Sequence, residues 1–330
     1  MELRSNGELP MTALTRIRIL SLMVICLWSG MGIVRGAEPA LGFQTNPSGV
    51  NLLADGEVVA AYVFADEKIP RPYFAHVRLP GGPQLTRNHP PKEGDAQDHE
   101  LLHPGIWFAL GDINGNDNWR LKAPVRGGGF IEQPAVKEGT GTFAVRNRYY
   151  ANDGKEQLLT EDCRYSFVVR PTGLLLMIDS QLTADVDCRF GDGMEEMGLG
   201  VRLATPLAVK SGMGGEILNS EGRKGEGATR ERLVDWCDYH GTIDGRKVGI
   251  TIFASPENSR KTWWHNRDYG FFAANAFHAH PDRPDNTPII LKKGESVRLR
   301  YGVALHGDTP TVAYDPAAEY QTYTQQSAGK

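Results

Sequence analysis

Hydrophobic positions along this chain gather in short runs of strand length, and polar turns separate one run from the next. The first such run is Val58–Phe64. Further runs follow from residue 143 onward: Phe143–Tyr150, Cys163–Val169, Leu174–Leu182, Met197–Leu203, Val248–Phe253 and Val297–Leu305. Turn signals such as Asn152-Asp153-Gly154 and Asp244-Gly245 lie between several of the runs, as is typical of β-hairpins.

Because no helical pattern intervenes between these runs, the sequence argues against a doubly wound α/β fold and favours antiparallel sheets. The number of runs in a chain of 330 residues predicts an all-β fold, a large antiparallel β-sandwich with long functional loops. We expect a single sandwich domain over residues 50–312, preceded by a polar arm over residues 37–49. The tail over residues 313–330 is polar, and we expect it to be frayed.

The N-terminal stretch departs from this strand pattern. Arg16 and Arg18 precede an apolar run from Ile19 to Val34, and small residues follow at Gly36 and Ala37. This arrangement predicts a secretory signal peptide over residues 1–36. No later apolar run is long enough to span a bilayer, so we expect a mature chain without a membrane span, in the periplasm or outside the cell.

Charge and cysteine content narrow the function classes. The formal net charge is −4, and residues 1–36 carry four basic and two acidic residues, so the mature chain would stand near −6. Mild acidity without a block of Lys or Arg argues against nucleic acid or an anionic membrane as a partner. The three remaining cysteines, Cys163, Cys188 and Cys237, permit three buried thiols or one disulfide, for which Cys163–Cys188 is the pair in neighbouring strands.

The stretch Thr262–Phe277 mixes aromatic and polar side chains without clean alternation or a helical period. Its candidate site residues are Trp263, Trp264, His265, Arg267, Asp268 and Asn275. Aromatic faces beside hydrogen-bonding groups suit a sugar ring or another polar, partly apolar small molecule, because the ring stacks while its hydroxyls are paired. The alternative interpretation is a buried aromatic cluster whose polar members bond to the backbone.

A long polar loop, Thr86–Leu102, leads into a second group of candidates. They are His99, His103, Trp107 and Asp117. Histidines at i and i+4 can chelate one divalent metal from a helix face, but Pro104-Gly105 places His103 at a terminus or in a loop. A metal on His99 and His103 is therefore an option and not an implication. The glycine-rich stretch 211–227 lacks the spacing of a phosphate-binding loop, so no nucleotide cofactor is expected.

Alternation through the strand that holds Met197 places Glu195 on the apolar face of a sheet. A carboxyl group on an apolar face has its protonated form favoured, which suits a general acid or base near neutral pH. The neighbouring Glu196 has a plainer interpretation, a surface ion pair with Arg202.

Several of these segments together resemble a bacterial exported family labelled "methane oxygenase PmoA". The segments are Arg71-Pro72-Tyr73-Phe74, Asp98-His99, His103-Pro104-Gly105-Ile106-Trp107-Phe108, Gly111–Gly115, Glu196-Met197-Gly198 and Trp263–Gly270. The resemblance spans about residues 50–308 and implies a fold similar to the galactose-mutarotase supersandwich. In that fold class sugar rings lie on a concave sheet, and a histidine and a carboxylate perform acid–base chemistry. The labelled activity is that of a protein with several membrane spans, which this sequence does not share.

Three functional hypotheses follow. The first is an exported carbohydrate-active enzyme, a lyase, hydrolase or epimerase, with His103, His265, Glu195 and Asp268 as acid–base candidates. Its ligand-binding candidates are Arg267, Asn275, Trp107, Trp263, Trp264 and Asp117. The second is a non-catalytic carbohydrate-binding or scaffold protein with the same aromatic wall, and the third is a metal-dependent oxygenase, as the family label suggests. The first hypothesis requires that Thr262–Phe277 and the loop His99–Trp119 lie together.

Overall fold

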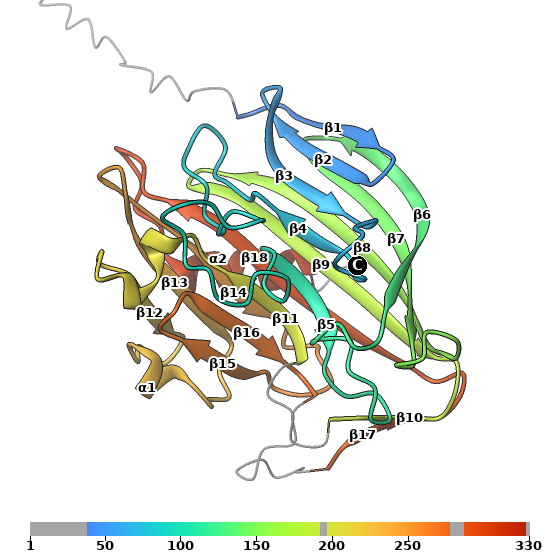
Figure 1. Ribbon diagram of the computed structural model, residues 1–330. Helices are drawn as coiled ribbons and strands as arrows, with labels where there is room; N and C mark the ends of the chain where they lie inside the picture. Colours follow the sequence, from blue (N-terminus) through green and yellow to red (C-terminus); the bar gives the residue numbers. More distant parts are fainter. Residues whose placement is uncertain (1–37, 192–196, 278–286, 328–330) are drawn as a thin grey trace, which may run out of the picture. The chain divides into compact units, whose positions relative to one another are not determined.

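The computed structural model describes residues 38–191, 197–277 and 287–327, and most of them belong to two eight-stranded sheets (Figure 1). The first sheet has the order β1(Leu41–Asn46), β2(Gly49–Ala54), β3(Glu57–Val63), β4(Tyr73–Ala75), β5(Ile106–Leu110), β11(Met197–Arg202), β16(Phe271–Asn275), β15(Trp263–Arg267). The second has the order β12(Glu216–Asn219), β13(Trp236–Ile243), β14(Arg246–Ala254), β18(Ser296–Gly307), β9(Gly173–Ala184), β8(Gln157–Arg170), β7(Thr140–Tyr150), β6(Val125–Lys137). A ribbon of β10(Cys188–Phe190) and β17(Ile289–Leu291) is separate from both sheets.

Neighbouring strands pair antiparallel throughout these sheets, and alternate side chains build the core. In β8, for example, Cys163, Tyr165 and Phe167 are buried, whereas Asp162 and Arg164, on either side of Cys163, point away from the core. Such alternation is the pattern of a sheet with one face on a core. The all-β prediction is therefore confirmed, and each predicted run overlaps a strand. The strands are longer than the runs because backbone pairing continues through the outward polar residues.

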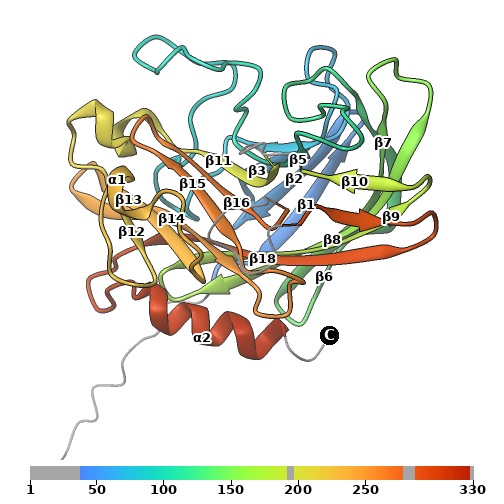
Figure 2. The same ribbon diagram turned by 90° about the horizontal axis from the view of Figure 1, so that it is seen from below.

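Helix α2(Pro316–Ser327) lies against the face of the second sheet that is turned away from the core (Figure 2). Tyr323 is 1% exposed and stacks on Phe253, with the ring centroids 5.6 Å apart. The prediction of a frayed tail is thus wrong, because two tyrosines, Tyr320 and Tyr323, anchor this polar segment to the sheet. The short helix α1(Glu226–Thr229) lies between β12 and β13. Neither helix of the described chain has the length and apolar character needed to cross a bilayer.

Two further expectations need correction. The predicted polar arm contains strand β1, whose Leu41 and Phe43 pack against the core. The pairing of Cys163 with Cys188 does not occur, since both are buried free thiols, as is Cys237. The Cys188 thiol instead donates to the carbonyl oxygens of neighbouring backbone, at 3.3 Å.

A buried carboxyl group interrupts the apolar core. Glu161, 3% exposed, accepts hydrogen bonds from Ser180 Oγ at 2.6 Å, Asn147 Nδ2 at 2.9 Å and the Tyr149 hydroxyl at 3.2 Å. Burial raises the pKa of this carboxyl, although the three hydrogen bonds act in the opposite direction. The native state therefore holds the Glu161 proton more tightly than the unfolded chain does.

This pKa shift gives stability a pH dependence of known sign. A group whose pKa is raised in the folded state contributes stability below its unfolded pKa, about 4.3 for Glu, and that contribution is lost as pH rises through the folded pKa. We expect the free energy of unfolding, measured by urea denaturation, to fall relative to that of a Glu161→Gln variant as pH rises above the unfolded pKa. The control is Glu57→Gln at an exposed position. Its free energy of unfolding should change with pH in parallel with that of the wild type. Parallel curves for Glu161→Gln as well would contradict the expectation.

Candidate functional site

The first sheet is buried on both faces over β5, β11, β16 and β15. Side chains that face the second sheet, such as Ile106 and Phe272, belong to the main core. The opposite side chains form a second cluster that includes Trp107, Trp119 and Phe271. We call this second face the outer face of the first sheet. The outer face carries most of the candidate residues. Because the sheet is buried on both faces here, Thr262–Phe277 lacks a clean alternation of apolar and polar residues.

A glycine makes room for the two tryptophans on this outer face. Trp107 and Trp119 lie against Gly200 of β11, with their ring centroids 5.3 Å apart. A Cβ atom at position 200 would come within 2.7 Å of Trp107 and 2.8 Å of Trp119. Both indole rings therefore occupy space that a side chain at position 200 would fill.

We expect Gly200→Ala to lower the free energy of unfolding by about 1–3 kcal/mol, the usual cost of overpacking a rigid core. Displacement of the two indoles should also shift the intrinsic tryptophan fluorescence. The matched control is Gly227→Ala, because an added Cβ there meets nothing within 4 Å. Equal stability of the two variants in urea denaturation would show that the tryptophan pair tolerates displacement.

Parallel rings from two distant segments stack on the outer face. His99 lies 4.6 Å from His103 at an interplanar angle of 10°, and 5.6 Å from Tyr269 at 13°. His103 continues the stack onto Trp107 at 5.0 Å and onto Phe271 at 4.7 Å. The structure thus brings the His99–Trp119 loop and the stretch Thr262–Phe277 into direct contact, as the enzyme hypothesis requires.

Arg87 holds the histidine loop in place. Its guanidinium group, 1% exposed, donates to the carbonyl oxygens of Ala96 at 2.8 Å, Asp98 at 2.5 Å, His99 at 3.3 Å and His103 at 3.2 Å. These four carbonyls belong to a segment without regular secondary structure. The guanidinium group of Arg87 therefore supplies the hydrogen bonds that regular secondary structure would otherwise give these carbonyls.

Asp98 connects a buried arginine to an exposed histidine. Its carboxylate accepts two hydrogen bonds from Arg202, at 2.7 and 2.8 Å, and its Oδ2 lies 2.7 Å from His99 Nδ1. Partial burial acts to raise the pKa of this carboxyl, but the bonds from Arg202 and His99 hold it well below its usual range. An ionised Asp98 makes Nδ1 of His99 the protonated nitrogen, so Nε2 carries the lone pair. The His99 side chain is 43% exposed, so the ring reaches solvent.

His103 is shielded by the same arrangement. It is 4% exposed, and its Nδ1 lies 3.4 Å from Arg202. The pKa of its imidazole is well below the usual range because burial, and then the charges of Arg202, His99, Arg71 and Arg87, disfavour the protonated form. His103 is therefore a neutral ring that supports the stack.

Arg71 joins the two loops that cover the outer face. Its guanidinium donates to the carbonyl oxygens of Trp119 and Leu102, and its carbon lies 5.3 Å from the centroid of Trp107. Arg71 and Arg87 thus bond mainly to backbone oxygens, so their positive charge is only partly balanced on this face. Arg202 and Arg267 lie beside the same face, with guanidinium carbons 4.8 and 5.5 Å from the ring centroid of Tyr269, and each is paired with a carboxylate, that of Asp98 and of Glu226 respectively.

His265 and Trp263 lie on the same outer face, on strand β15. Their rings are 6.0 Å apart, and His265 lies 5.5 Å from Phe271, which also contacts His103. The two predicted catalytic histidines therefore flank one phenylalanine. Their rings are linked through this apolar ring, which excludes direct proton transfer across it.

Trp264 does not serve the role predicted for it, and Asp117 bonds within its own loop. Trp264 faces the main core, is fully buried, and donates from Nε1 to the Val234 carbonyl at 2.9 Å. It cannot be a stacking surface because neighbouring residues of a strand point to opposite faces. Asp117 folds back on its own loop, with Oδ1 accepting from the Arg120 backbone at 2.9 Å and Oδ2 lying 3.5 Å from Lys122.

Arg267 and Asp268 flank Tyr269 of the stack, and Asn275 lies further along the same sheet. Arg267 pairs with Glu226 at 3.2 Å, and the backbone N–H of Asp268 donates to the same carboxylate at 2.7 Å. Asn275 is fully buried opposite Trp263 in the β15–β16 pair, and its Oδ1 accepts from the Phe277 backbone at 2.8 Å. Glu195 lies outside the described residues.

The geometry of the two stacked histidines does not fit a shared metal ion. Nitrogen lone pairs lie in the plane of an imidazole ring, and the planes of His99 and His103 are nearly parallel and offset. One ion cannot lie in both planes, and three guanidinium groups nearby oppose a cation. Within the ranges that the structure describes, no group of three or more His, Cys, Asp or Glu residues is arranged to hold a metal ion.

The contacts of Arg71, Arg87 and Arg202 and the pairing of Asp98 with His99 were not predicted from the sequence. The Asp98-His99 pair is adjacent in the sequence, so an orienting carboxylate could have been suspected. Arg87 and Arg71 had no such signal, because their partners are backbone carbonyls of other segments.

Comparison with known proteins gives a family and distant structural likenesses. A model of a family of unknown function, DUF6807, matches residues 49–317. A search of curated proteins finds no match. A galactose mutarotase related enzyme from Lactobacillus acidophilus is similar over 83% of this chain and 100% of its own, at 10% identity and a TM-score of 0.38. A galactose mutarotase-like protein from Lactobacillus casei is similar over 81% of this chain and 100% of its own, at 11% identity and a TM-score of 0.38. A polysaccharide lyase is similar over 83% of this chain and 33% of its own, at 9% identity and a TM-score of 0.25.

Proposed function

Since this chain belongs to the DUF6807 family, whose function is unknown, we propose its function from its own site. The protein is a carbohydrate-active enzyme that removes a proton from a sugar carbon next to a carbonyl or carboxylate group. His99 is the base, and Asp98 orients it. The enzyme acts outside the cytoplasm, in keeping with the signal peptide expected over residues 1–36.

The bridge from Arg202 through Asp98 to His99 carries this proposal. A histidine whose Nδ1 bonds to an ionised carboxylate presents Nε2 as an acceptor and stabilises the proton it takes up. The pair lies at the exposed end of an aromatic stack, and Tyr269 covers one face of His99. Aromatic rings beside hydrogen-bonding groups are the usual surroundings of a sugar.

The charge on this face favours a lyase or epimerase over a hydrolase. When a base removes a proton next to a carbonyl, the electron pair moves to the oxygen, and a guanidinium group such as that of Arg267, 35% exposed beside Tyr269, can stabilise the resulting negative charge. Hydrolysis of a glycoside instead uses a protonated carboxylic acid with a raised pKa. Asp98 has a lowered pKa and cannot supply that acid near neutral pH.

The test is a panel of uronate-containing oligosaccharides, reducing sugars and keto sugars, incubated with the purified chain in deuterium oxide. We expect deuterium to enter the sugar carbon, or an unsaturated product to form, and both to be lost in Asp98→Asn. New reducing ends without deuterium and without an unsaturated product would identify a hydrolase and overturn the proposed reaction. Binding without any turnover would support the carbohydrate-binding alternative and overturn the enzymatic proposal.

A further inference from the structure

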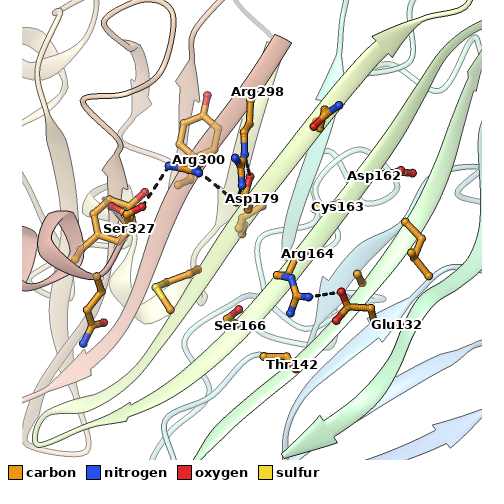
Figure 3. A pocket seen from close by; sticks show the side chains of 18 residues that line it. Glu132, Thr142, Asp162, Cys163, Arg164, Ser166, Asp179, Arg298, Arg300 and Ser327 are labelled. Carbon is orange, nitrogen blue, oxygen red and sulfur yellow. Dashed lines mark hydrogen bonds and ion pairs between the residues drawn. The ribbon is translucent and has the colours of Figure 1, made fainter. Parts of the chain in front are cut away.

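A separate cavity of about 590 Å³ lies on the face of the second sheet that is turned away from the core (Figure 3). Strands β7, β8, β9 and β18 form its floor. Glu132 of β6 stands on one side, and the end of helix α2, at Ser327, stands on the other. This volume is within the range of small-molecule sites, roughly 300–1,000 Å³.

Strand register arranges the floor in rows. One row runs across the strands as Ala144, Arg164, Asp179 and Arg300. The next row, two residues along, runs as Arg146, Asp162, Gln181 and Arg298. On the opposite side of the first row lie Thr142 and Ser166. Their side chains are small, so a depression remains there between β6 and α2.

The charges in this cavity balance. Its lining includes three arginines and three carboxylates, namely Arg164, Arg298, Arg300, Glu132, Asp162 and Asp179. The arginines pair with acids: Arg298 Nε lies 2.6 Å from Asp179, and Arg164 pairs with Glu132. An anionic or cationic ligand would have to separate one of these pairs, whereas a neutral ligand would not.

Paired arginines and carboxylates still retain hydrogen-bonding capacity. A guanidinium group has five N–H donors, and a carboxylate accepts about four hydrogen bonds. Outward side chains repeat about every 6.6–6.8 Å along a strand and about every 4.8 Å across strands. A ligand that matches this surface is neutral, extended and dense in hydroxyl groups.

From this cavity we propose a second binding site, for a neutral oligosaccharide. The chain would use it to hold a neutral polysaccharide, independently of any reaction at His99. The site extends the proposed function, but its own existence does not depend on catalysis.

The experiment measures binding of cellohexaose, xylohexaose, mannohexaose and hexagalacturonate to the purified chain by isothermal titration calorimetry. We expect at least one neutral hexasaccharide to bind and hexagalacturonate not to compete with it. Thr142→Tyr fills the depression and should weaken binding by about tenfold or more. Thr183→Tyr is the matched control, because Thr183 lies on the same outward face but outside the cavity. This variant should bind the hexasaccharide with unchanged affinity.

Two further variants keep the result interpretable. Gln181→Ala removes a lining amide with little risk to folding and should weaken binding by a few fold. His99→Ala should leave the affinity unchanged, which separates this site from the proposed catalytic one. Lack of binding by every neutral hexasaccharide at millimolar concentration would overturn the proposal. So would binding that Thr142→Tyr and Gln181→Ala leave intact, or that His99→Ala abolishes.

Discussion

Replacement of His99 with alanine is expected to lower kcat by about 10²–10⁴-fold, the usual contribution of a general base. The reason is the position of this ring: its Nδ1 lies 2.7 Å from an ionised Asp98, and its side chain is 43% exposed. Deuterium exchange or product formation on the substrate found in the panel measures the effect. KM should change little, because Tyr269 and the buried aromatic rings remain in place.

The structure offers a closely matched control for this variant. His240 also bonds through Nδ1 to an aspartate, Asp238, at 2.6 Å, but it lies on the second sheet. His240→Ala should therefore leave kcat unchanged. If both variants lose activity equally, the loss reflects damage to the fold. If His99→Ala stays fully active, the assignment of the base is wrong.

The fold was predictable because its signal is local. Runs such as Cys163–Val169 contain enough apolar residues to identify a strand, and the turns between them contain Asn, Asp and Gly. The outward polar residues that lengthen strand β8 to Gln157–Arg170 carry no such signal. Helix α2 was missed for a related reason, since its contact with the sheet depends on tyrosines scattered through a polar segment.

The sequence identified several of the residues that lie together on the outer face, but not the neighbours that surround them. The sequence identified His99 and His103 together, yet assigned the acid–base role to His103 and a metal role to both. Burial reverses this order, because the charged neighbours of His103 keep it neutral while His99 reaches solvent. Those neighbours include Arg87 and Arg202, which approach from other parts of the chain, and no spacing rule reports such contacts.

The same limit explains the error at Trp264. In a sheet with one exposed face, alternation would have separated Trp263 from Trp264 at once. Strand β15 is buried on both faces, so both tryptophans look equally suited to a site wall. Only the packing on either side shows that Trp263 lies with His265 and that Trp264 belongs to the core.

Replacement of Arg87 with methionine is expected to lower the free energy of unfolding by about 3–5 kcal/mol. Four carbonyl oxygens then lose one shared donor, and each buried unpaired acceptor costs about 1–3 kcal/mol before the loop opens to water. Arg87→Lys should recover little, because a single ammonium group cannot reach all four oxygens. Urea denaturation followed by circular dichroism measures the change.

Arg146→Met is the control for this experiment, because Arg146 is 44% exposed and pairs with Asp162 on the surface. Such a pair contributes at most about 1 kcal/mol. Since Arg87 fixes the carbonyls of Asp98 and His99, its loss should also displace the proposed base, so activity should fall even where the variant is fully folded. A folded Arg87→Met variant with normal stability and normal kcat would mean that the histidine loop holds its shape without this arginine. The aromatic stack of His99, His103 and Tyr269 would then be the element that positions the site.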